Sequence, residues 1–396
     1  MAHINFTLEL EDVQEIINHS GANELSKQLL STIFNQLMEK QRDDYIGVGE
    51  YVRDDQRTSH RNGYYEREFT TRIGTLDLIV PRTRDGLFSP DLFERYQRNE
   101  KALLNSMLEM YVQGVSTRKV SKVVEELCGK SVSKSFVSSL TVHLDEEVEA
   151  FLTRKFESSY PFIMSDVLRL KIRENKRVVS KALHIVLGIN QEGKREVLGF
   201  RLDDTESTSS WKEIYEELIG RGLKGVKMVI SDAHLGEVEA IKQCFTGASW
   251  QRCQVHFMRN VFDKLPKKKT QDVRSELKAL FKMTRITTAR EYKNLLIDKY
   301  SLIYPSMTQT LDEGFEDSFQ YCALEETTYS RLKSTNMLER VNEEIRRREK
   351  VIRIFPNAAS AIRLIGTLLL DISDDWLSSS RQYIQFSDET HQWIKT

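Results

Sequence analysis

Residues 226–260 read VKMVISDAHLGEVEAIKQCFTGASWQRCQVHFMRN, and this stretch decides the fold. Residues 226–230 form a short, largely apolar run with β-branched members, which is typical of a buried strand. Asp232 follows where that strand should end, and catalytic groups of open α/β folds gather at the carboxyl ends of strands. Apolar side chains at helical spacing over 235–245, beginning with Leu235, then predict a helix. The sequence therefore predicts one carboxylate at a strand tip, followed by a helix.

The end of the stretch holds a second pattern. A short strand is expected around Trp250, and Cys253 and His256 follow it in a CxxH arrangement. Zinc sites use cysteine and histidine but usually need four ligands. Cys244 and His234 are candidate partners, but they have no recognised zinc spacing. We therefore interpret Cys253 and His256 as a structural pair near the active site.

Three further strands and a helix are predicted upstream of this stretch. Apolar runs at 161–173, 178–190 and 196–204 indicate strands, because turn-forming residues such as Asn175 separate them. Residues 209–222 have the pattern of a helix. Three hairpin-linked strands, a helix and another strand predict an α/β core.

Three carboxylates are candidates for metal-dependent chemistry, and each also has a purely structural interpretation. Asp166 lies within the first predicted strand, where an unpartnered buried carboxylate is costly; alternatively, it faces solvent from a half-exposed strand. Asp232 could be a helix N-cap or a turn residue. Glu339 stands three residues after Asn336, which is also the spacing of a capping box. From residue types alone, both interpretations of each carboxylate stay open.

The N-terminal part of the chain has a different pattern of residues. Residues 1–45 are predicted to be helical, as a helix packed on its own domain or as a dimerisation helix. Two β-segments are predicted at 64–69 and 75–81. Arginines cluster around them: Arg61, Arg67, Arg72, Arg82 and Arg84. Such a cluster suits contact with phosphates, or it is a solvated charged edge.

The segment that follows is predicted to be helical with few breaks. Helices are expected at 103–112 and 117–127, and a third starts at Lys134 with Ser133 as its N-cap. Helix, short turn and helix is the pattern of a helix-turn-helix. Its last helix would present Lys134 and Ser135 to the major groove of DNA. Helical pairs joined by short turns are also common in other proteins.

Residues 257–330 have a helical and charged pattern, and roughly 70 residues are too many for a loop without its own structure. We therefore predict a helical insertion. A helix carrying Glu339 follows. Arg346 and Arg347 on this helix either approach the DNA backbone or complement the helix dipole. A further apolar helix is expected at 358–372.

Composition limits the class of protein. The 396 residues are 40% hydrophobic and 30% charged with a net charge of −1, so any DNA contact must come from local basic patches. Four scattered cysteines are no disulfide framework and fit a reducing cytosol. The N-terminus lacks a signal-peptide pattern, and the longest apolar run, residues 364–370, is too short to span a bilayer. A cytoplasmic protein is expected.

Several segments together resemble the mutator-type transposases of bacterial insertion sequences, which are related to the eukaryotic MULE elements. That family has a strand-end SDAH, then QRCxxH and an Arg-Asn pair; here these are residues 231–234, 251–256 and 259–260. The segments RNGYYEREFTTRIGTLDLIVPRTRDG at 61–86 and STNMLERVNEEIRRR at 334–348 also look like family segments. The resemblance covers nearly the whole chain.

The resemblance implies a DDE transposase with a ribonuclease-H-like core and a helical insertion. Its carboxylate triad would be Asp166, Asp232 and Glu339, which hold two Mg²⁺ ions, with Mn²⁺ able to substitute. Asp166 is expected to bridge both ions, Asp232 to bind one and Glu339 the other. The implied reaction is cleavage of DNA strands at the terminal inverted repeats of an insertion sequence, followed by strand transfer.

Partners and domains follow from the same resemblance. The expected partners are double-stranded DNA, as element ends and target, and a second copy of the chain when two ends are synapsed; the expected location is the bacterial cytosol, without a membrane. The predicted DNA-contacting residues are Arg61, Arg72, Arg82, Arg84, Lys119, Lys134, Ser135, Arg346 and Arg347. The predicted domains are a helical region (1–55), a small β-containing DNA-contacting region (56–98), the helix-turn-helix (99–150), the first part of the core (158–256), the helical insertion (257–330) and the last part of the core (331–396).

Two other classes of protein stay open. A ribonuclease-H-like nuclease or resolvase would share the metal site, but it predicts cleavage without joining. A helix-turn-helix regulator of transcription predicts neither product and leaves Asp166, Asp232 and Glu339 unexplained.

Overall fold

The computed structural model describes residues 22–49, 57–71, 73–91, 100–128, 132–324 and 331–395. Arg72 and the first part of the expected N-terminal helix, residues 1–21, lie outside the described residues. The chain divides into two compact units, Met1–Val142 and His143–Thr396.

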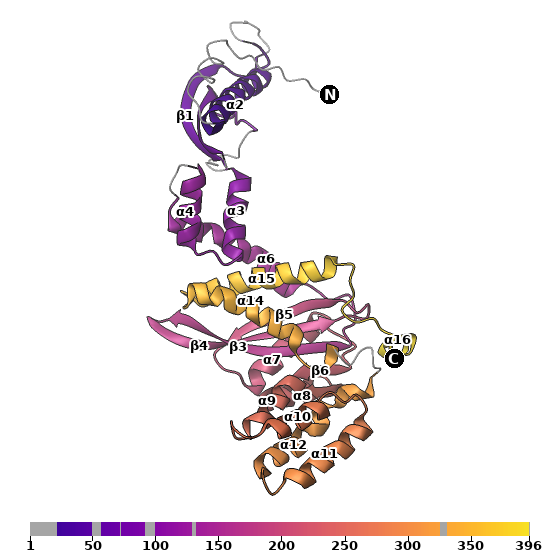
Figure 1. The fold of residues 1–396 in the computed structure, drawn as a ribbon. Coiled ribbons are helices and arrows are strands. Elements are labelled where there is room, and N and C mark those ends of the chain that lie inside the picture. The colour runs from indigo at the N-terminus through magenta and orange to yellow at the C-terminus, as the bar shows by residue number, and fades with distance from the viewer. Residues whose placement is uncertain are drawn as a thin grey trace. The chain divides into compact units, whose positions relative to one another are not determined.

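The first unit begins with a long helix on a β-hairpin. Helix α2 (Ala22–Ile46) packs on strands β1 (Arg61–Thr71) and β2 (Gly74–Thr83), which pair antiparallel (Figure 1). The buried side chains between helix and hairpin alternate along β2, as expected for a sheet with one covered face. They are Met38, Phe69, Leu76, Leu78 and Val80. The two predicted β-segments are therefore confirmed, and each is longer than expected.

Three short helices complete this unit. Helices α3 (Lys101–Val112), α4 (Thr117–Cys128) and α5 (Lys134–Leu140) share an apolar core. Ser133 caps α5, because its hydroxyl accepts a hydrogen bond from the amide of Phe136 at 3.0 Å. The predicted helices and this cap are confirmed. A short 3₁₀ turn at 141–143 then leads into α6 (Leu144–Thr153) of the second unit.

A five-stranded sheet forms the centre of the second unit, in the order β5-β4-β3-β6-β7. Strands β3 (Phe162–Glu174), β4 (Arg177–Ile189) and β5 (Arg195–Asp203) form an antiparallel meander. Strands β6 (Met228–Ser231) and β7 (Ser249–Arg252) run parallel to β3. All five predicted strands are confirmed, to within two residues at most ends.

The turn between β3 and β4 explains why the two strands stay in register for so long. Asn175 and Lys176 both have positive φ, 47° and 65°. Two such residues in a two-residue loop match the right-handed twist of the flanking strands.

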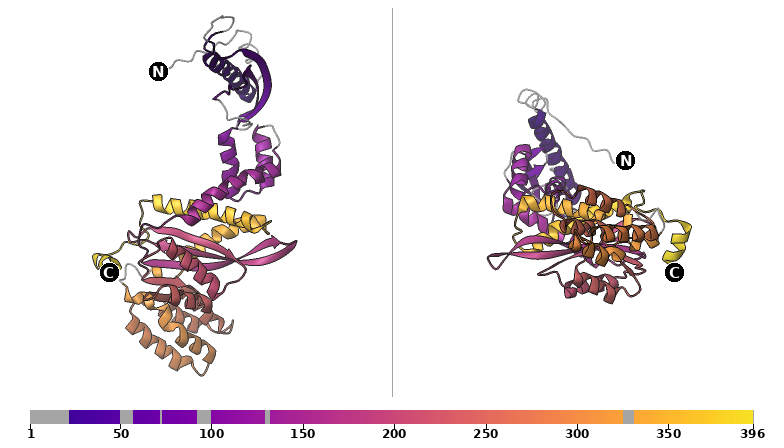
Figure 2. Two further views of the ribbon diagram at one scale, coloured as in Figure 1. Left: turned by 180° about the vertical axis from the view of Figure 1, so that it is seen from behind. Right: turned by 60° about the horizontal axis from the view of Figure 1, so that its bottom comes forward.

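Helices cover both faces of the sheet (Figures 1 and 2). Helices α7 (Thr208–Gly220) and α8 (Leu235–Cys244) pack on one face around the fully buried Trp211. Helices α14 (Asn336–Ile352) and α15 (Ala358–Ser378) lie on the other face, together with α6. Leu235 was expected on the apolar side of α8, but it is 86% exposed.

Between β7 and α14 the chain forms helices with a core of their own. They are α9 (Gln254–Asp263), α10 (Gln271–Leu280), α11 (Ile286–Tyr300) and α12 (Pro305–Ser318), followed by a 3₁₀ turn (Gln320–Ala323). Their shared core includes Phe257, Phe281 and Phe315. The chain ends with α16 (Asp388–Lys395). Among the described residues, no helix is long and apolar enough to cross a membrane.

Candidate active site

Asp166 lies within β3 and faces α14. One carboxylate oxygen accepts the amide N–H of Val167 at 2.8 Å, and the other accepts the side-chain amide of Asn342 at 2.7 Å. Burial raises the pKa of Asp166. The two hydrogen bonds and the nearby positive charge of His256 act in the opposite direction. The carboxylate is thus half-buried and held in one orientation, rather than pointing freely into solvent.

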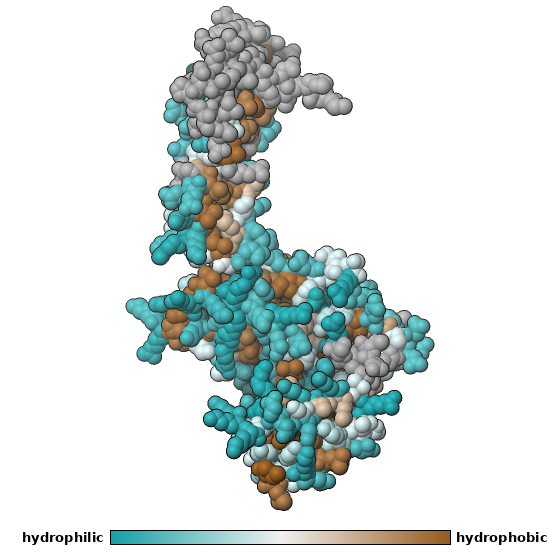
Figure 3. All heavy atoms as spheres, viewed as in Figure 1, coloured by the Kyte–Doolittle hydropathy of each residue, from teal (hydrophilic) through white to brown (hydrophobic). Residues whose placement is uncertain are grey.

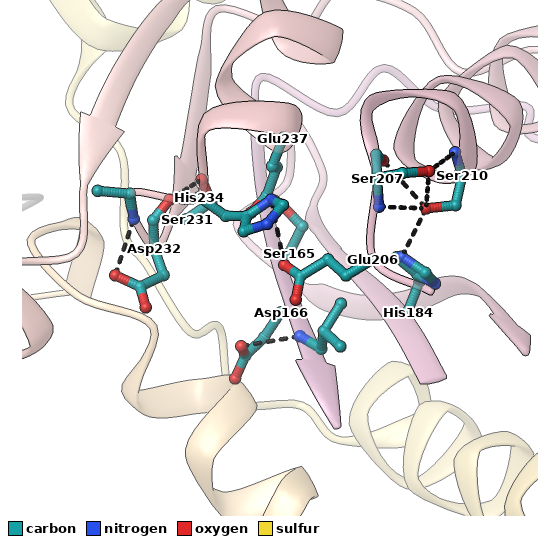
Figure 4. Close-up of polar contacts among 12 residues, drawn as sticks. Ser165, Asp166, His184, Glu206, Ser207, Ser210, Ser231, Asp232, His234 and Glu237 are labelled. Atoms are coloured by element: carbon teal, nitrogen blue, oxygen red, sulfur yellow. Dashed lines mark hydrogen bonds and ion pairs between the residues drawn. The ribbon is translucent and has the colours of Figure 1, made fainter. Parts of the chain in front are cut away.

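Asp232 stands directly after β6, with its side chain 48% exposed. Its carboxylate accepts the amide N–H of Ala233 at 2.7 Å (Figure 4). Ser231 donates to the backbone carbonyl of Asp232 at 3.0 Å, and the indole of Trp250 donates to Ser231 at 3.0 Å. His234, not Asp232, is the residue that precedes α8, so the N-cap interpretation of Asp232 is wrong.

Glu339 lies in the first turn of α14 with its side chain 37% exposed. Asn336 is the first residue of this helix, and Thr335 occupies the N-cap position without a side-chain cap hydrogen bond. The capping-box interpretation of Glu339 is therefore wrong: Asn336 does not cap α14, so Glu339 is not at the capping-box position. Its carboxylate instead faces the imidazole of His256.

The imidazole of His256 lies between two of the carboxylates. Its Nδ1 is 3.7 Å from an oxygen of Asp232, and its Nε2 is 3.8 Å from an oxygen of Glu339. The hydrogen bond with Cys253 raises the pKa of His256 to about 9, although burial opposes this rise. The negative charges of Asp232 and Asp166 add to the rise in pKa. His256 is therefore a cation at neutral pH, and it draws the end of β6 and the start of α14 together.

Cys253 is buried beside His256. Burial alone would raise the pKa of its thiol, but hydrogen bonds with His256 and Thr335 outweigh burial, and the net shift is downward. Its sulfur accepts from the amide N–H and the hydroxyl of Thr335, at 3.5 and 3.3 Å. The contact between Cys253 and Thr335 thus joins the start of α9 to the residue that precedes α14.

The donor set has the chemistry that Mg²⁺ prefers. Asp166, Asp232 and Glu339 offer carboxylate oxygens from three separate elements, and hard divalent cations take oxygen ligands. Across the described ranges, no three His, Cys, Asp or Glu side chains are grouped closely enough to hold a metal ion. Among the same described residues, no third His, Cys, Asp or Glu side chain joins Cys253 and His256 in such a group. Asp232 and Glu339 instead flank the imidazole of His256.

Comparison with known proteins decides the family. Residues 1–379 match the family model described as Transposase, Mutator family. The chain belongs to this family of transposases. It is 57% identical, over 98% of its length and the whole of the relative, to the transposase for insertion sequence element IS256 in transposon Tn4001 of Staphylococcus aureus. It is 41% identical, over 91% of both chains, to the transposase for insertion sequence element ISRM5 of Rhizobium meliloti.

A solved structure with some likeness is the Drosophila P element transposase strand transfer complex. The identity is 12% and the TM-score is 0.30, over 76% of this chain and 86% of that one. A TM-score this low carries no argument about the transposase.

Sequence reasoning missed two residues of the site, Asn342 and Glu237. Glu237 is 1% exposed on α8, and it accepts the hydroxyls of Ser165 at 2.5 Å and Tyr215 at 3.1 Å. Burial raises the pKa of Glu237 well above its ordinary value, and its hydrogen bond with Ser165 places it against β3. A signal was present, because Glu237 stands at helical spacing from the buried Ile241.

A second polar network of the transposase lies in the same view (Figure 4). His184 is fully buried, and its Nε2 is 3.2 Å from the hydroxyl of Ser210. Burial lowers the pKa of His184 to about 4, so the ring is neutral. Ser210 is buried and closes a capping box with Ser207 at the start of α7. This network is structural, because the hydroxyl is committed to the helix cap.

The predicted DNA-contacting residues of the first unit fall into two groups. Arg61 is held at 2.5 Å by Asp43, and the guanidinium of Arg82 lies 4.6 Å from the ring centre of Tyr65. The others are exposed: Arg84, Lys119, Lys134 and Ser135. Arg72 lies outside the described residues.

In the second unit, both predicted arginines are engaged, Arg346 with β3 and Arg347 on its own helix. Arg346 donates to the backbone carbonyl of Arg169 at 3.0 Å, and Arg347 lies 3.0 Å from Glu344. Arg346 therefore ties α14 to β3.

Proposed function

We propose that this transposase binds the terminal inverted repeats of an insertion sequence and catalyses metal-dependent cleavage and transfer of DNA strands. The observation that carries the proposal is the convergence of Asp232 and Glu339 on His256, with Asp166 held beside them by Asn342. These carboxylates come from three elements far apart in the chain. Carboxylates gathered in this way are suited to stabilising charge on attacking and leaving oxygens through divalent ions.

The finer description of the fold belongs to the same proposal. We infer a ribonuclease-H-like core, supported by an antiparallel meander β3–β5 with two strands parallel to β3. The helices α9 to α12 would then be an insertion in that core. Helices α3 to α5 would be a helix-turn-helix, supported by exposed Lys134 and Ser135 at the start of α5.

Asp166, Asp232 and Glu339 would hold Mg²⁺ in this proposal. When bound, the metal lowers the pKa of the attacking hydroxyl or water and neutralises charge on the phosphate. The chain itself supplies orientation. The amides of Val167 and Asn342 fix both oxygens of Asp166, and the amide of Ala233 fixes one oxygen of Asp232.

The proposed partners are duplex DNA, as element ends and as target, and a second copy of the chain. A reaction that joins two ends of one element needs both ends in one complex, so a homodimer on DNA is the expected assembly. Sedimentation of the protein with and without end DNA measures this assembly directly.

The test uses the full chain, labelled duplex carrying the element end, and Mg²⁺ or Mn²⁺. Wild type should give both cleaved and joined strands, and Glu339→Gln should give neither while still binding the duplex. Glu343→Gln is the matched control, because Glu343 is exposed on the same helix. Cleavage without joining would instead support a nuclease or resolvase, and specific binding without any product would support a regulator.

Asn342 should be a positioning residue for Asp166. In Asn342→Leu, a side chain of similar size no longer donates to the carboxylate, so its orientation is released. We expect strand cleavage to fall about 10- to 100-fold, the range found when the partner of a metal-binding carboxylate is lost. The Mg²⁺ concentration for half-maximal rate should rise, a readout that a purely structural role would not move. Unchanged Mg²⁺ dependence with unchanged rate would remove Asn342 from the site.

A further inference from the structure

The β3–β4 hairpin extends well beyond the rest of the sheet. β3 and β4 pair along their whole length, from Phe162 with Ile189 to Glu174 with Arg177. β6 pairs only with the first three residues of β3, and β5 pairs with β4 no further than Ala182. Residues 170–181 therefore form a two-stranded segment without a further strand beside it. We call residues 169–181 the ribbon; in Figure 1 it is the outer end of the β3–β4 hairpin.

One face of the ribbon is anchored. Leu170 and Ile172 are buried. The segment after α14 joins the edge of β3, because the amide of Phe355 donates to the carbonyl of Lys171 at 2.9 Å and its carbonyl accepts the amide of Arg173 at 2.9 Å. These contacts fix the ribbon to the body of the second unit. It is therefore a rigid projection and not a loose loop.

The other face of the ribbon is cationic and exposed. Side chains alternate between the faces of a strand, so Arg169, Lys171 and Arg173 share the face opposite Leu170 and Ile172. All three are exposed; Figure 3 shows hydrophilic side chains together with a small apolar patch at this projection, and Val178, which pairs with Arg173, is 48% exposed. Alternating cations of this kind stand about 7 Å apart along a strand.

The ribbon concentrates positive charge in a chain whose net charge is −1. Glu174 is its single acidic residue. Its cations are Arg169, Lys171, Arg173, Lys176, Arg177 and Lys181. Lys181 is neutralised by Glu174 at 2.7 Å and Asp204 at 2.8 Å, and Arg169 reaches Glu206 only at 4.0 Å.

Four cations of the ribbon have no such counter-charge. Across the part of the chain that the structure describes, no carboxylate lies within ion-pair distance of Lys171, Arg173, Lys176 or Arg177. Surface cations usually serve solubility when opposite charges are mixed among them. Lys171 and Arg173 therefore lack counter-charges on one face of a rigid projection, while Lys176 lies in the turn and Arg177 lies opposite Glu174 on the other face.

We propose that the ribbon is a binding surface for the phosphate backbone of the DNA that continues beyond the cleavage site. The inference rests on the proposed function, because it needs DNA that extends past the end of the element. Arg169 follows Asp166 by three residues on the same strand, or about 10 Å, and Arg173 lies about 23 Å along it. Because side chains alternate along a strand, Asp166 points to the same face as Leu170 and Ile172, so the cationic face is a DNA contact separate from the carboxylates.

The chemistry of the ribbon favours contact without sequence preference. Lysine and arginine bind phosphates, which position DNA but carry no sequence information. DNA outside an element differs at each site of insertion, so a surface that reads only phosphates suits flanking or target DNA.

The test compares three variants of the full chain by binding to a random-sequence duplex over a range of salt concentrations. The ribbon variant is Arg169→Gln with Lys171→Gln and Arg173→Gln, which removes the three charges of the cationic face and keeps the side-chain lengths similar. The matched control is Lys155→Gln with Lys224→Gln and Lys242→Gln, three exposed cations away from the ribbon. A conservative variant, Arg169→Lys with Lys171→Arg and Arg173→Lys, keeps every charge.

The slope of log affinity against log salt should become less steep by roughly 2 to 3 in the ribbon variant, since each lost phosphate contact contributes about 0.9. The affinity at about 0.15 M salt should fall at least about tenfold. The control and the conservative variant should stay near wild type. A ribbon variant that behaves as the control does would overturn the inference, even if wild type cleaves and joins DNA. Absence of cleavage by wild type would reject the proposed function, while the salt slopes would still decide whether the ribbon binds DNA.

Discussion

Asp166→Asn should reduce strand cleavage and joining at least about a thousandfold while leaving the affinity for end DNA nearly unchanged. Asparagine keeps the size of the side chain but loses the negative charge that would hold the metal. It also loses one of the two hydrogen bonds of Asp166, because only one of its terminal atoms can accept from Val167 or Asn342. Both the charge and the orientation of this group are therefore removed, with little change in volume.

Cleavage and joining are measured on one denaturing gel with labelled end duplex, and binding is measured by a mobility shift. Asp298→Asn is the matched control, because Asp298 is exposed on α11. Wild-type activity in Asp166→Asn would take this residue out of the proposed site. Lost binding together with lost activity would point to a structural defect, and thermal unfolding of both variants separates that outcome.

Glu237→Gln should stabilise the second unit, and the gain should grow with pH. Because the folded-state pKa of Glu237 lies well above its value in the unfolded chain, about 4.3, the folded state holds a proton that the unfolded state has released. The free energy of unfolding of wild type then falls as pH rises from about 4.3 towards the folded-state pKa. Glutamine carries no charge and keeps the acceptor for Ser165 and Tyr215. The difference in the free energy of unfolding between Glu237→Gln and wild type should widen by about 1.4 kcal/mol per pH unit in that pH range.

Urea unfolding at pH 6, 7 and 8, followed by tryptophan fluorescence, measures this difference. All four tryptophans lie in the second unit, so their signal reports that unit: Trp211, Trp250, Trp376 and Trp393. Glu239→Gln is the control, because Glu239 is exposed two residues further along α8. If the difference in the free energy of unfolding between Glu237→Gln and wild type stays constant with pH, Glu237 is not held protonated in the folded state.

Local patterns predicted most elements of the fold. The strands β3, β4 and β5 were predictable because an apolar run or a turn-forming residue determines local structure within a few positions. Asn175, for example, favours a turn whatever the later course of the two strands. The cap of α5 by Ser133 was equally local. The expected burial of Leu235 was wrong. Helical spacing defines an apolar stripe on a helix, but it does not show which edge of that stripe packs on the sheet.

The candidate site was predictable only in part. Asp166, Asp232 and Glu339 were proposed from motif resemblance together with their predicted elements, and each alone had a structural explanation. The hydrogen bond from Asn342 to Asp166 joins residues 176 positions apart. Such a contact depends on where α14 packs on the sheet, which no local pattern contains. Glu237 was hidden for a related reason, since its burial depends on Ser165 and Tyr215 from two other elements.

The order of the three carboxylates along the chain has a consequence for synthesis. Glu339 follows Asp232 by more than a hundred positions, and the helices α9 to α12 fill most of that interval. At the usual rate of translation, the ribosome needs about 5 to 20 seconds to cross it. During that time the nascent chain carries its first unit and two of the three carboxylates but cannot complete the site. In the proposed function, a chain that stops in this interval would keep the first unit and lack Glu339, the third carboxylate of the proposed site.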